Sequence, residues 1–353
     1  MGTPVVIVGS REVGVGRPTY IVAEMSANHG QRYERAVEIL RAAKAAGADA
    51  VKIQTYTPET MTLKCDDDRF RIRETIWEGR NLYDLYQEAY TPWEWHAGLA
   101  EIARGLGLDL FSTPFDATAV DFLERLDVPA YKVASFELVD LPLLKRVAAT
   151  GKPVLVSTGM ATLAEIDEAV RAVRENGSGG LALLKCTSAY PAPPEEMNLR
   201  CIPHLQESFG VPVGLSDHTL GSAVPVAAVA LGACIVEKHL TLSRATPGPD
   251  SSFSLEPDEF RRMVQAIRSA ERALGQVAYG VGAEEAKSRA FRRSLFVVKA
   301  MEEGERFTYE NVRSIRPSHG LHPRHLDDVV GRTASRAIMP GTPLSWDLIA
   351  GSR

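Results

Sequence analysis

The most constraining feature of this sequence is an alternation of short apolar runs with amphipathic helical stretches, repeated eight times between residues 20 and 274. Because units of this kind pair their strands in parallel, the repetition predicts a parallel sheet covered by helices. Eight units in about 250 residues match the size of a (β/α)8 TIM barrel. The predicted strands are 20–24, 50–54, 108–112, 130–134, 153–157, 182–186, 213–216 and 235–239.

The main alternative for such an alternation is a doubly wound open sheet. No G-x-G-x-x-G segment follows the first predicted strand, and no G-x-x-x-x-G-K-[ST] segment occurs anywhere in the chain. Both absences count against a nucleotide-binding sheet. We therefore expect an α/β TIM barrel at residues 1–274 and a linker at 275–287. Short apolar runs and glycine-containing turns predict a small β-rich domain at 288–353.

Composition argues against several functional classes. The chain has 40 Lys and Arg against 45 Asp and Glu, and a net charge of −5 does not suit a general nucleic-acid binder. The longest run without a charged or strongly polar residue, residues 223–236, is interrupted by Pro225 and Gly232. It is also shorter than the ~20 apolar residues of a membrane span. Residues 1–16 lack the features of a signal peptide, so we expect a cytoplasmic protein.

Polar and charged residues stand at the carboxyl end of every predicted strand. In a TIM barrel these ends meet on one face, where the enzymes of this fold carry out their chemistry. Loops are polar in any protein, which accounts for the serines and threonines. The polarity of loops does not account well for lysines and carboxylates inside apolar runs, since buried charges need partners. The residues are Glu24, Lys52, Gln54, Ser112, Thr113, Lys132, Ser135, Ser157, Lys185, Thr187, Ser216, Asp217, His218, Glu237 and His239.

These residue types suggest specific ligands. Lys52 and Lys132 are predicted to be buried cations that await an anion, and nearby hydroxyls suit a phosphate or a carboxylate. His218 and His239 end consecutive strands, where two imidazoles can hold one divalent cation. A hydrogen-bonded pair or a general acid are the alternatives for these histidines. Glu24 is a candidate acid or base, or a structural partner of a lysine.

Several separate motifs, in matching order, resemble the sialic acid synthase family along essentially the whole chain. The resemblance is carried by residues 23–29 (AEMSANH), 47–54 (GADAVKIQ), 112–115 (STPF), 131–135 (YKVAS), 157–160 (STGM), 214–220 (GLSDHTL) and 237–239 (EKH). Further stretches are similar to the branch that makes pseudaminic acid. These are 54–58 (QTYTP), 83–96, 185–191 (KCTSAYP), 250–260, 313–317 (RSIRP) and 320–323 (GLHP).

The resemblance implies that the enzyme condenses phosphoenolpyruvate with an open-chain acylated amino sugar and water. The products are a nine-carbon 2-keto acid and phosphate. In the pseudaminic branch the sugar is 2,4-diacetamido-2,4,6-trideoxy-L-altrose. A divalent metal, Mn²⁺ or Mg²⁺, is implied as the cofactor that polarises the sugar aldehyde. The small domain resembles SAF domains, which are similar to type III antifreeze proteins, and the implied assembly is a domain-swapped homodimer.

The resemblance also implies a role for individual residues. It makes His218 and His239 the metal ligands and Glu24 the essential carboxylate near the reacting carbons. The implied contacts of phosphoenolpyruvate are Lys52, Thr113, Lys132, Ser135, Ser157, Ser188 and Ser216. Those of the sugar are Gln54, Tyr190, Glu237, Asp250 and, from the partner subunit, Arg316.

Two positions depart from the acetylneuraminate branch. Ser188 replaces an Asn that touches phosphoenolpyruvate, which weakens that contact. Lys238 replaces an Arg, and strand alternation turns it away from Glu237 and His239, so we expect little effect. Residues 55–90 are expected to form a long, irregular, aromatic-rich insert of unassigned role.

Three alternatives stay open. The alternative within the family is an N-acetylneuraminate or legionaminate synthase. Outside the family, one alternative is an aldolase in which a barrel lysine forms a Schiff base. The other is a binding protein in which the barrel is only a scaffold for the small domain.

Overall fold

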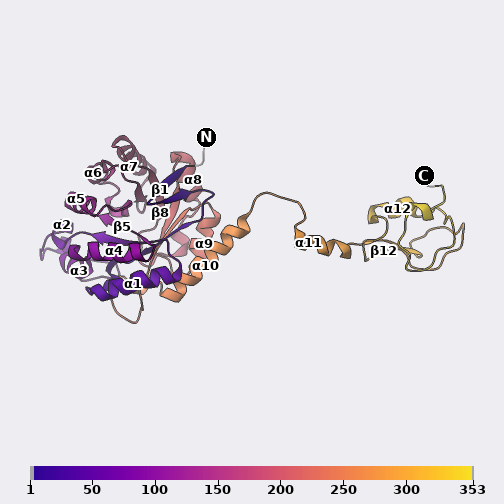
Figure 1. Ribbon diagram of the computed structural model, residues 1–353, viewed down its shortest axis with the longest axis horizontal. Coiled ribbons are helices and arrows are strands. Elements are labelled where there is room, and N and C mark those ends of the chain that lie inside the picture. The colour runs from indigo at the N-terminus through magenta and orange to yellow at the C-terminus, as the bar shows by residue number, and fades with distance from the viewer. Residues whose placement is uncertain (1–3, 352–353) are drawn as a thin grey trace. The chain divides into compact units, whose positions relative to one another are not determined.

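The structure, a computed structural model, describes residues 4–351. The chain divides into two compact units, Met1–Gly275 and Gln276–Arg353 (Figure 1). The first unit holds the alternating strands and helices, and the second holds the small β-containing part. No helix in residues 4–351 is long and apolar enough to cross a membrane.

Within the described part of the first unit, eight parallel strands close into a barrel in the order β10-β3-β4-β5-β6-β7-β8-β9. The predicted fold class is confirmed, and the observed strand bounds differ from the predicted ones by no more than two residues. The barrel closes where β10 pairs with β3, from Ile235 beside Tyr20 to His239 beside Glu24. The strands are β3 (Tyr20–Glu24), β4 (Ala50–Thr55), β5 (Asp109–Pro114), β6 (Tyr131–Val133), β7 (Val154–Ser157), β8 (Leu181–Cys186), β9 (Val213–Asp217) and β10 (Ile235–His239).

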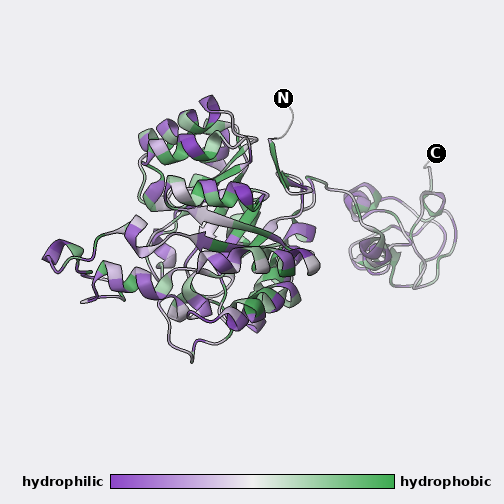
Figure 2. Ribbon diagram, turned by 60° about the vertical axis from the view of Figure 1, so that its left-hand side comes forward, coloured by the Kyte–Doolittle hydropathy of each residue, from purple (hydrophilic) through white to green (hydrophobic). Residues whose placement is uncertain are grey.

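Amphipathic helices surround the strands. In α10, Phe260, Met263, Val264 and Ile267 are buried at the spacing of one helical face. Figure 2 shows this division: the inner strands are mostly hydrophobic, and the outer helices carry both kinds of residue. The helices are α1 (Tyr33–Ala46), α4 (His96–Gly105), α5 (Ala117–Arg125), α6 (Leu141–Ala148), α7 (Leu163–Glu175), α8 (Cys201–Phe209), α9 (Ala223–Ala230) and α10 (Pro257–Leu274).

The insert at residues 55–90 is more ordered than the irregular stretch that we expected. It contains α2 (Pro58–Met61) and α3 (Leu82–Ala89). The α3 helix begins after Asn81, whose side-chain oxygen accepts a hydrogen bond from the Tyr83 N–H at 2.9 Å. Side chains of this type are preferred at helix starts because they satisfy a free N–H group.

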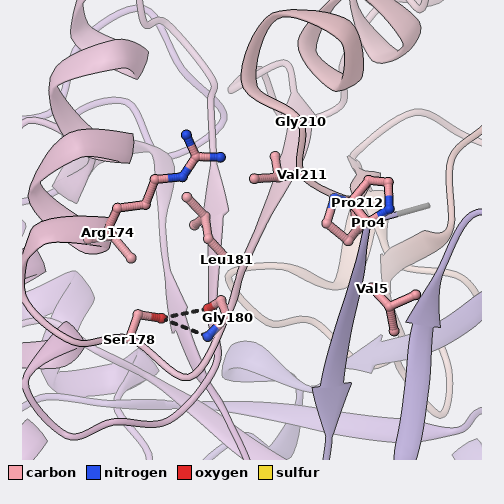
Figure 3. A pocket seen from close by; sticks show the side chains of 10 residues that line it. Pro4, Val5, Arg174, Ser178, Gly180, Leu181, Gly210, Val211 and Pro212 are labelled. Carbon is pink, nitrogen blue, oxygen red and sulfur yellow. Dashed lines mark hydrogen bonds between the residues drawn. The ribbon is translucent and has the colours of Figure 1, made fainter. Parts of the chain in front are cut away.

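A hairpin that the sequence analysis did not assign covers the N-terminal end of the barrel. Its strands are β1 (Val5–Val8) and β2 (Arg11–Gly14). Val6, Val8 and Val13 belong to the same buried cluster as Phe111 and Leu155 of the barrel interior. Beside it lies a cavity of about 280 Å³ (Figure 3). Arg174 is the one charged residue of its lining, and Ser178 bonds to the backbone of Gly180. This set has no acid–base pair.

The second unit is built on a short antiparallel pair, β11 (Ser294–Val297) and β12 (Val312–Ile315). Its small core includes Leu295, Phe307 and Leu344. It also contains α11 (Ala283–Ser288) and α12 (Leu326–Val329). The α11 helix overlaps the predicted linker, and all of its residues are exposed.

The packing around β9 predicts a large penalty for one added methyl group. A Cβ on Gly214 would lie 2.5 Å from the Ile235 Cβ and 2.6 Å from the Ile235 carbonyl oxygen. We expect Gly214→Ala to lower the free energy of unfolding by about 3 kcal/mol, because an overpacked core must distort. Urea denaturation measures this change. Gly105→Ala is the matched control, since nothing lies within 4 Å of its added Cβ. An equal loss in both variants would contradict the argument.

A buried histidine predicts a loss of stability in acid. The His96 Nε2 lies 2.8 Å from the Thr55 hydroxyl, and burial lowers the pKa of His96 from 6.5 to about 4. The unfolded chain therefore binds this proton first as the pH falls, so stability is lost between pH 6.5 and 4, by up to about 3 kcal/mol.

We expect His96→Gln to be less stable than the wild type at pH 7 but to lose less stability between pH 7 and pH 4. Urea denaturation across this range measures the difference. His204→Gln, at an exposed position, serves as the control. Parallel pH curves for wild type and His96→Gln would sink the interpretation.

Candidate active site

The carboxyl ends of the barrel strands surround a cavity of about 620 Å³. Strands that lie far apart in the sequence all contribute to its wall. The structure thus brings most of the sequence-predicted site residues together in one place. They are Glu24, Lys52, Gln54, Lys132, Ser135, Ser157, Tyr190, Ser216, His218, Glu237, His239 and Asp250.

Lys52 is the centre of a buried charge cluster. Its Nζ lies 3.3 Å from Glu24 Oε2 and 3.1 Å from Glu237 Oε1, and all three side chains are at most 5% exposed. The sequence suggested that Lys52 is an unpaired cation that would bind an anionic ligand. In the structure, Lys52 already has two carboxylate partners. Strand pairing explains the cluster, since β4 and β10 both lie next to β3 in the barrel.

The pKa values of the two carboxyl groups in this cluster are shifted in opposite directions. Burial raises the pKa of Glu24 to about 7, and this effect exceeds the attraction of Lys52. Burial would also raise the pKa of Glu237, but Lys132, Lys52 and the Ser216 hydroxyl lower it below its ordinary value. Ser216 donates to Glu237 at 2.9 Å. Glu237 is therefore ionised at neutral pH, and Glu24 can exchange a proton there.

A second group of donors lies along β6 and β7. Burial lowers the pKa of Lys132 to about 8, and its Nζ donates to the carbonyl of Val133 at 3.1 Å. Ser135 accepts a hydrogen bond from the Gly159 N–H at 3.1 Å. The Ser157 hydroxyl is buried without a hydrogen-bond partner. One cation and two hydroxyls therefore face the cavity on this side.

The two histidines at the ends of β9 and β10 lie side by side, with ring centroids 5.4 Å apart. The His218 Nδ1 is 3.0 Å from the carbonyl oxygen of Thr187. This contact orients the His218 ring and does not involve its Nε2. The His239 Nδ1 is buried and has no partner. Burial lowers the pKa of His239 well below its ordinary value, so its ring is neutral. Neutral imidazole is the form that binds metal ions.

Two ligands are fewer than a closed metal site provides. Among residues 4–351, no group of three or more His, Cys, Asp or Glu side chains is arranged to hold a metal ion. If these two histidines held a metal ion, substrate and water would have to complete its coordination, as in an open catalytic site.

Aromatic and apolar side chains form another part of the cavity wall. The Tyr190 ring packs at a tilt against His218, with ring centroids 4.4 Å apart, and its centroid lies 5.6 Å from that of Trp77. The Trp77 indole N–H donates to the carbonyl of Pro249 at 2.8 Å, next to Asp250. Burial raises the pKa of Asp250, which accepts a hydrogen bond from the Ala27 N–H. Apolar insert residues extend this wall, namely Met61, Ile72, Leu82, Leu85 and Ala89.

Three of the residues to which the resemblance gave a role are not part of the cavity wall. Thr113 accepts a hydrogen bond from Lys52 at 3.4 Å, so it contacts the site through that lysine. The Ser188 hydroxyl lies 4.0 Å from the Cys186 sulfur. Arg316 is exposed in the second unit, outside the barrel.

Sequence reasoning also missed lining residues. Glu137 lines the cavity with one carboxylate oxygen buried and unpartnered, and burial raises its pKa to about 7. It lies beyond the end of β6, two residues after Ser135, where strand periodicity gives no signal. Trp77 lies in the insert, and only the folded chain brings it to Tyr190.

Unpartnered polar atoms concentrate in this cavity. Among the described residues, eight buried side-chain atoms lack a hydrogen-bond partner, and five of them belong to residues of the cavity lining. Four of these five have no partner of any kind shown, namely Glu137 Oε2, Ser157 Oγ, Glu237 Oε2 and His239 Nδ1. The fifth, Glu24 Oε2, has no hydrogen bond but is ion-paired with Lys52. Buried polar atoms are normally paired, so this set indicates a polar ligand site.

Comparison with known proteins agrees with this geometry. The chain matches the NeuB family over residues 39–279 and the SAF domain over residues 292–350. It is 47% identical over 337 residues to a pseudaminic acid synthase of Helicobacter pylori, covering 95% of this chain and 99% of that protein. It is 36% identical over 354 residues to an N,N'-diacetyllegionaminic acid synthase of Legionella pneumophila, covering 99% of each.

A solved structure supports the same assignment. The structure of an N-acetylneuraminic acid synthetase from Leptospira borgpetersenii, in complex with citrate, matches this chain with a TM-score of 0.72 and 29% identity. The match covers 81% of this chain and 95% of the other. The chain therefore belongs to the NeuB family and is an enzyme of that family, with a SAF domain at its C-terminal end.

Proposed function

We propose that the enzyme condenses phosphoenolpyruvate with 2,4-diacetamido-2,4,6-trideoxy-L-altrose and water to give pseudaminic acid and phosphate. The observation that carries this proposal is the cavity itself, where two buried lysines, two glutamates and two histidines converge with unpartnered polar atoms. The higher identity to a pseudaminic acid synthase than to a legionaminic acid synthase favours this branch over its sister branches.

The phosphoenolpyruvate end of the reaction suits the donors of β4, β6 and β7. This substrate carries a phosphate and a carboxylate, and lysines and hydroxyls are the groups that bind such anions. We assign Lys52, Lys132, Ser135 and Ser157 to it, with Thr113, Ser188 and Ser216 supporting them. An arriving anion would also compensate the buried charge of Lys132, for which no ion pair is found among residues 4–351.

Glu24 is assigned to proton transfer. Water must lose a proton when it adds to the second carbon of phosphoenolpyruvate, before phosphate leaves by C–O cleavage. A carboxylate whose pKa is near 7 can accept this proton at neutral pH. Gln54 donates to Glu24 Oε1 at 2.9 Å and Lys52 holds its other oxygen, so the group is oriented before substrate binds.

His218 and His239 are assigned to a divalent metal, Mn²⁺ or Mg²⁺. When bound, such an ion supplies a Lewis acid that polarises the sugar aldehyde. The unpartnered Nδ1 of His239 and the ring orientation of His218, fixed by Thr187, support this assignment.

The sugar is assigned to the wall formed by the insert. Gln54, Tyr190, Glu237 and Asp250 offer polar contacts, and the adjoining apolar insert residues suit a sugar that carries methyl groups. The 6-deoxy carbon and the two acetamido groups of the altrose derivative present such methyls, whereas N-acetylmannosamine has a hydroxymethyl group at the same end. Burial of a methyl group favours the trideoxy sugar by about 1 kcal/mol.

We also propose a domain-swapped homodimer in which Arg316 of one subunit contacts the sugar in the other. Exposed apolar side chains in the segments after β6, β7 and β9, up to the first residue of α7, support an interface near the cavity mouth. They are Phe136, Val139, Met160, Leu163 and Leu220. Exposed apolar groups that gather on one face indicate an interaction site.

The first prediction from this assignment concerns substrate and metal. With Mn²⁺, we expect phosphate release from phosphoenolpyruvate with the trideoxy-altrose sugar but not with N-acetylmannosamine or the legionaminate precursor. EDTA should abolish the release, and added Mn²⁺ should restore it. Release with another sugar moves the chain to a sister branch. EDTA-resistant activity together with borohydride trapping of pyruvate would establish the Schiff-base aldolase instead.

The second prediction concerns Glu24. We expect Glu24→Gln to lower kcat by at least about 100-fold, because an amide keeps the shape but cannot accept a proton. The KM for phosphoenolpyruvate should change much less. Steady-state kinetics measure both, and circular dichroism checks the fold. Glu34→Gln, at an exposed position of α1, is the control. A wild-type kcat in Glu24→Gln would remove this residue from the chemistry.

A further inference from the structure

A buried ion pair lies directly behind the two histidines. Lys238 and Asp217 are partners in the pairing of β10 with β9, and each comes immediately before a histidine in the chain. The Lys238 Nζ lies 2.5 Å from Asp217 Oδ2, and both side chains are 0% exposed. Lys238 was expected to have little effect because it faces away from the cavity. The direction is as expected, but the side chain is fully buried and bonded.

The bonds of this pair enclose His218. Besides Asp217, the Lys238 ammonium donates to the carbonyl oxygen of Thr219. Asp217 in turn accepts hydrogen bonds from the Thr219 N–H at 3.0 Å and the Thr219 hydroxyl at 3.1 Å. One cation on the strand of His239 therefore holds the residues on both sides of His218.

Stability alone does not explain such a pair. Two buried charges lose their hydration, and well-packed apolar residues of similar size are often equally stable or more stable. Apolar residues cannot supply directional hydrogen bonds that fix one segment relative to another. Lys238 has three N–H donors, and the two bonds above fix the turn at Thr219 relative to the end of β10.

We propose that Lys238 and Asp217 are positioning residues that hold the His218 and His239 rings at the separation needed to bind one divalent cation. The inference rests on the proposed metal role of these histidines. Neither residue is assigned to a contact with substrate or metal; they act through the backbone on either side of His218 and through the strand that ends at His239. Groups that hydrogen-bond directly to metal ligands typically change metal affinity by 10–100-fold, and we expect an effect of the same order from this pair.

The test measures Mn²⁺ binding to the full-length, metal-free enzyme without substrates. Electron paramagnetic resonance of free Mn²⁺ gives the Kd, and thermal unfolding gives the stability of each metal-free variant. In Lys238→Met/Asp217→Asn both charges are removed together, so no unpaired charge is left buried. We expect this variant to unfold near the wild-type temperature and to bind Mn²⁺ about 10–100-fold more weakly.

Two conservative variants keep the test decisive if the double variant does not fold. Lys238→Arg retains donors for Asp217 and Thr219, and its Kd for Mn²⁺ should stay within about threefold of the wild type, which is below the range expected when such a partner is lost. Asp217→Glu keeps the charge but displaces the carboxylate, and its Kd should rise about tenfold. His239→Ala is the control for loss of a proposed ligand.

The outcomes distinguish a failure of the positioning role from a failure of the proposed metal site. Wild-type affinity in Asp217→Glu, or in the double variant where it folds, overturns the positioning role while the metal role stands. Weakening in Lys238→Arg as large as in Asp217→Glu also overturns it, because retained donors would then bring no rescue. A wild-type enzyme that does not bind Mn²⁺, or binds it equally well after His239→Ala, overturns the proposed metal site and with it the inference.

Discussion

The pairing of β10 with β3 is the constraint on which the rest of the structure depends. These strands are the last and the first of the barrel, and their contact places His239 beside Glu24. Without closure, the carboxylate at the end of β3 and the residues of β9 and β10 would lie at opposite edges of an open sheet. Closure also leaves no free sheet edge in the barrel, so its strand ends are held on all sides.

Burial then sets the chemistry at those ends. Lys52, Glu24 and Glu237 share a space that water hardly reaches, where one cation faces two carboxylates. The second lysine, Lys132, joins Lys52 in lowering the pKa of Glu237, and Glu24 is left with a raised pKa. The same residues in a solvated loop would be screened and would not differ in this way. The barrel therefore gives two chemically similar side chains different protonation behaviour.

Much of the fold was predictable because the repeat of apolar runs reports burial directly. The strand bounds followed from it within two residues, and alternation placed Glu237 and His239 on one face and Lys238 on the other. The hairpin at residues 5–14 was missed because two strands of four residues carry little periodic signal. The helices of the insert were missed because its aromatic and charged residues do not repeat at a helical spacing over enough length.

The sequence by itself determined which residue types end each strand, and hence which chemical groups the barrel face can offer. It could not determine their partners. The tertiary structure decided that Lys52 lies between two glutamates and that Glu137 and Trp77 reach the cavity. It also decided that Lys238 bonds to both residues flanking His218. The physical reason is that strand order, barrel closure and loop packing bring together side chains far apart in the chain, and local patterns carry no information about such distances.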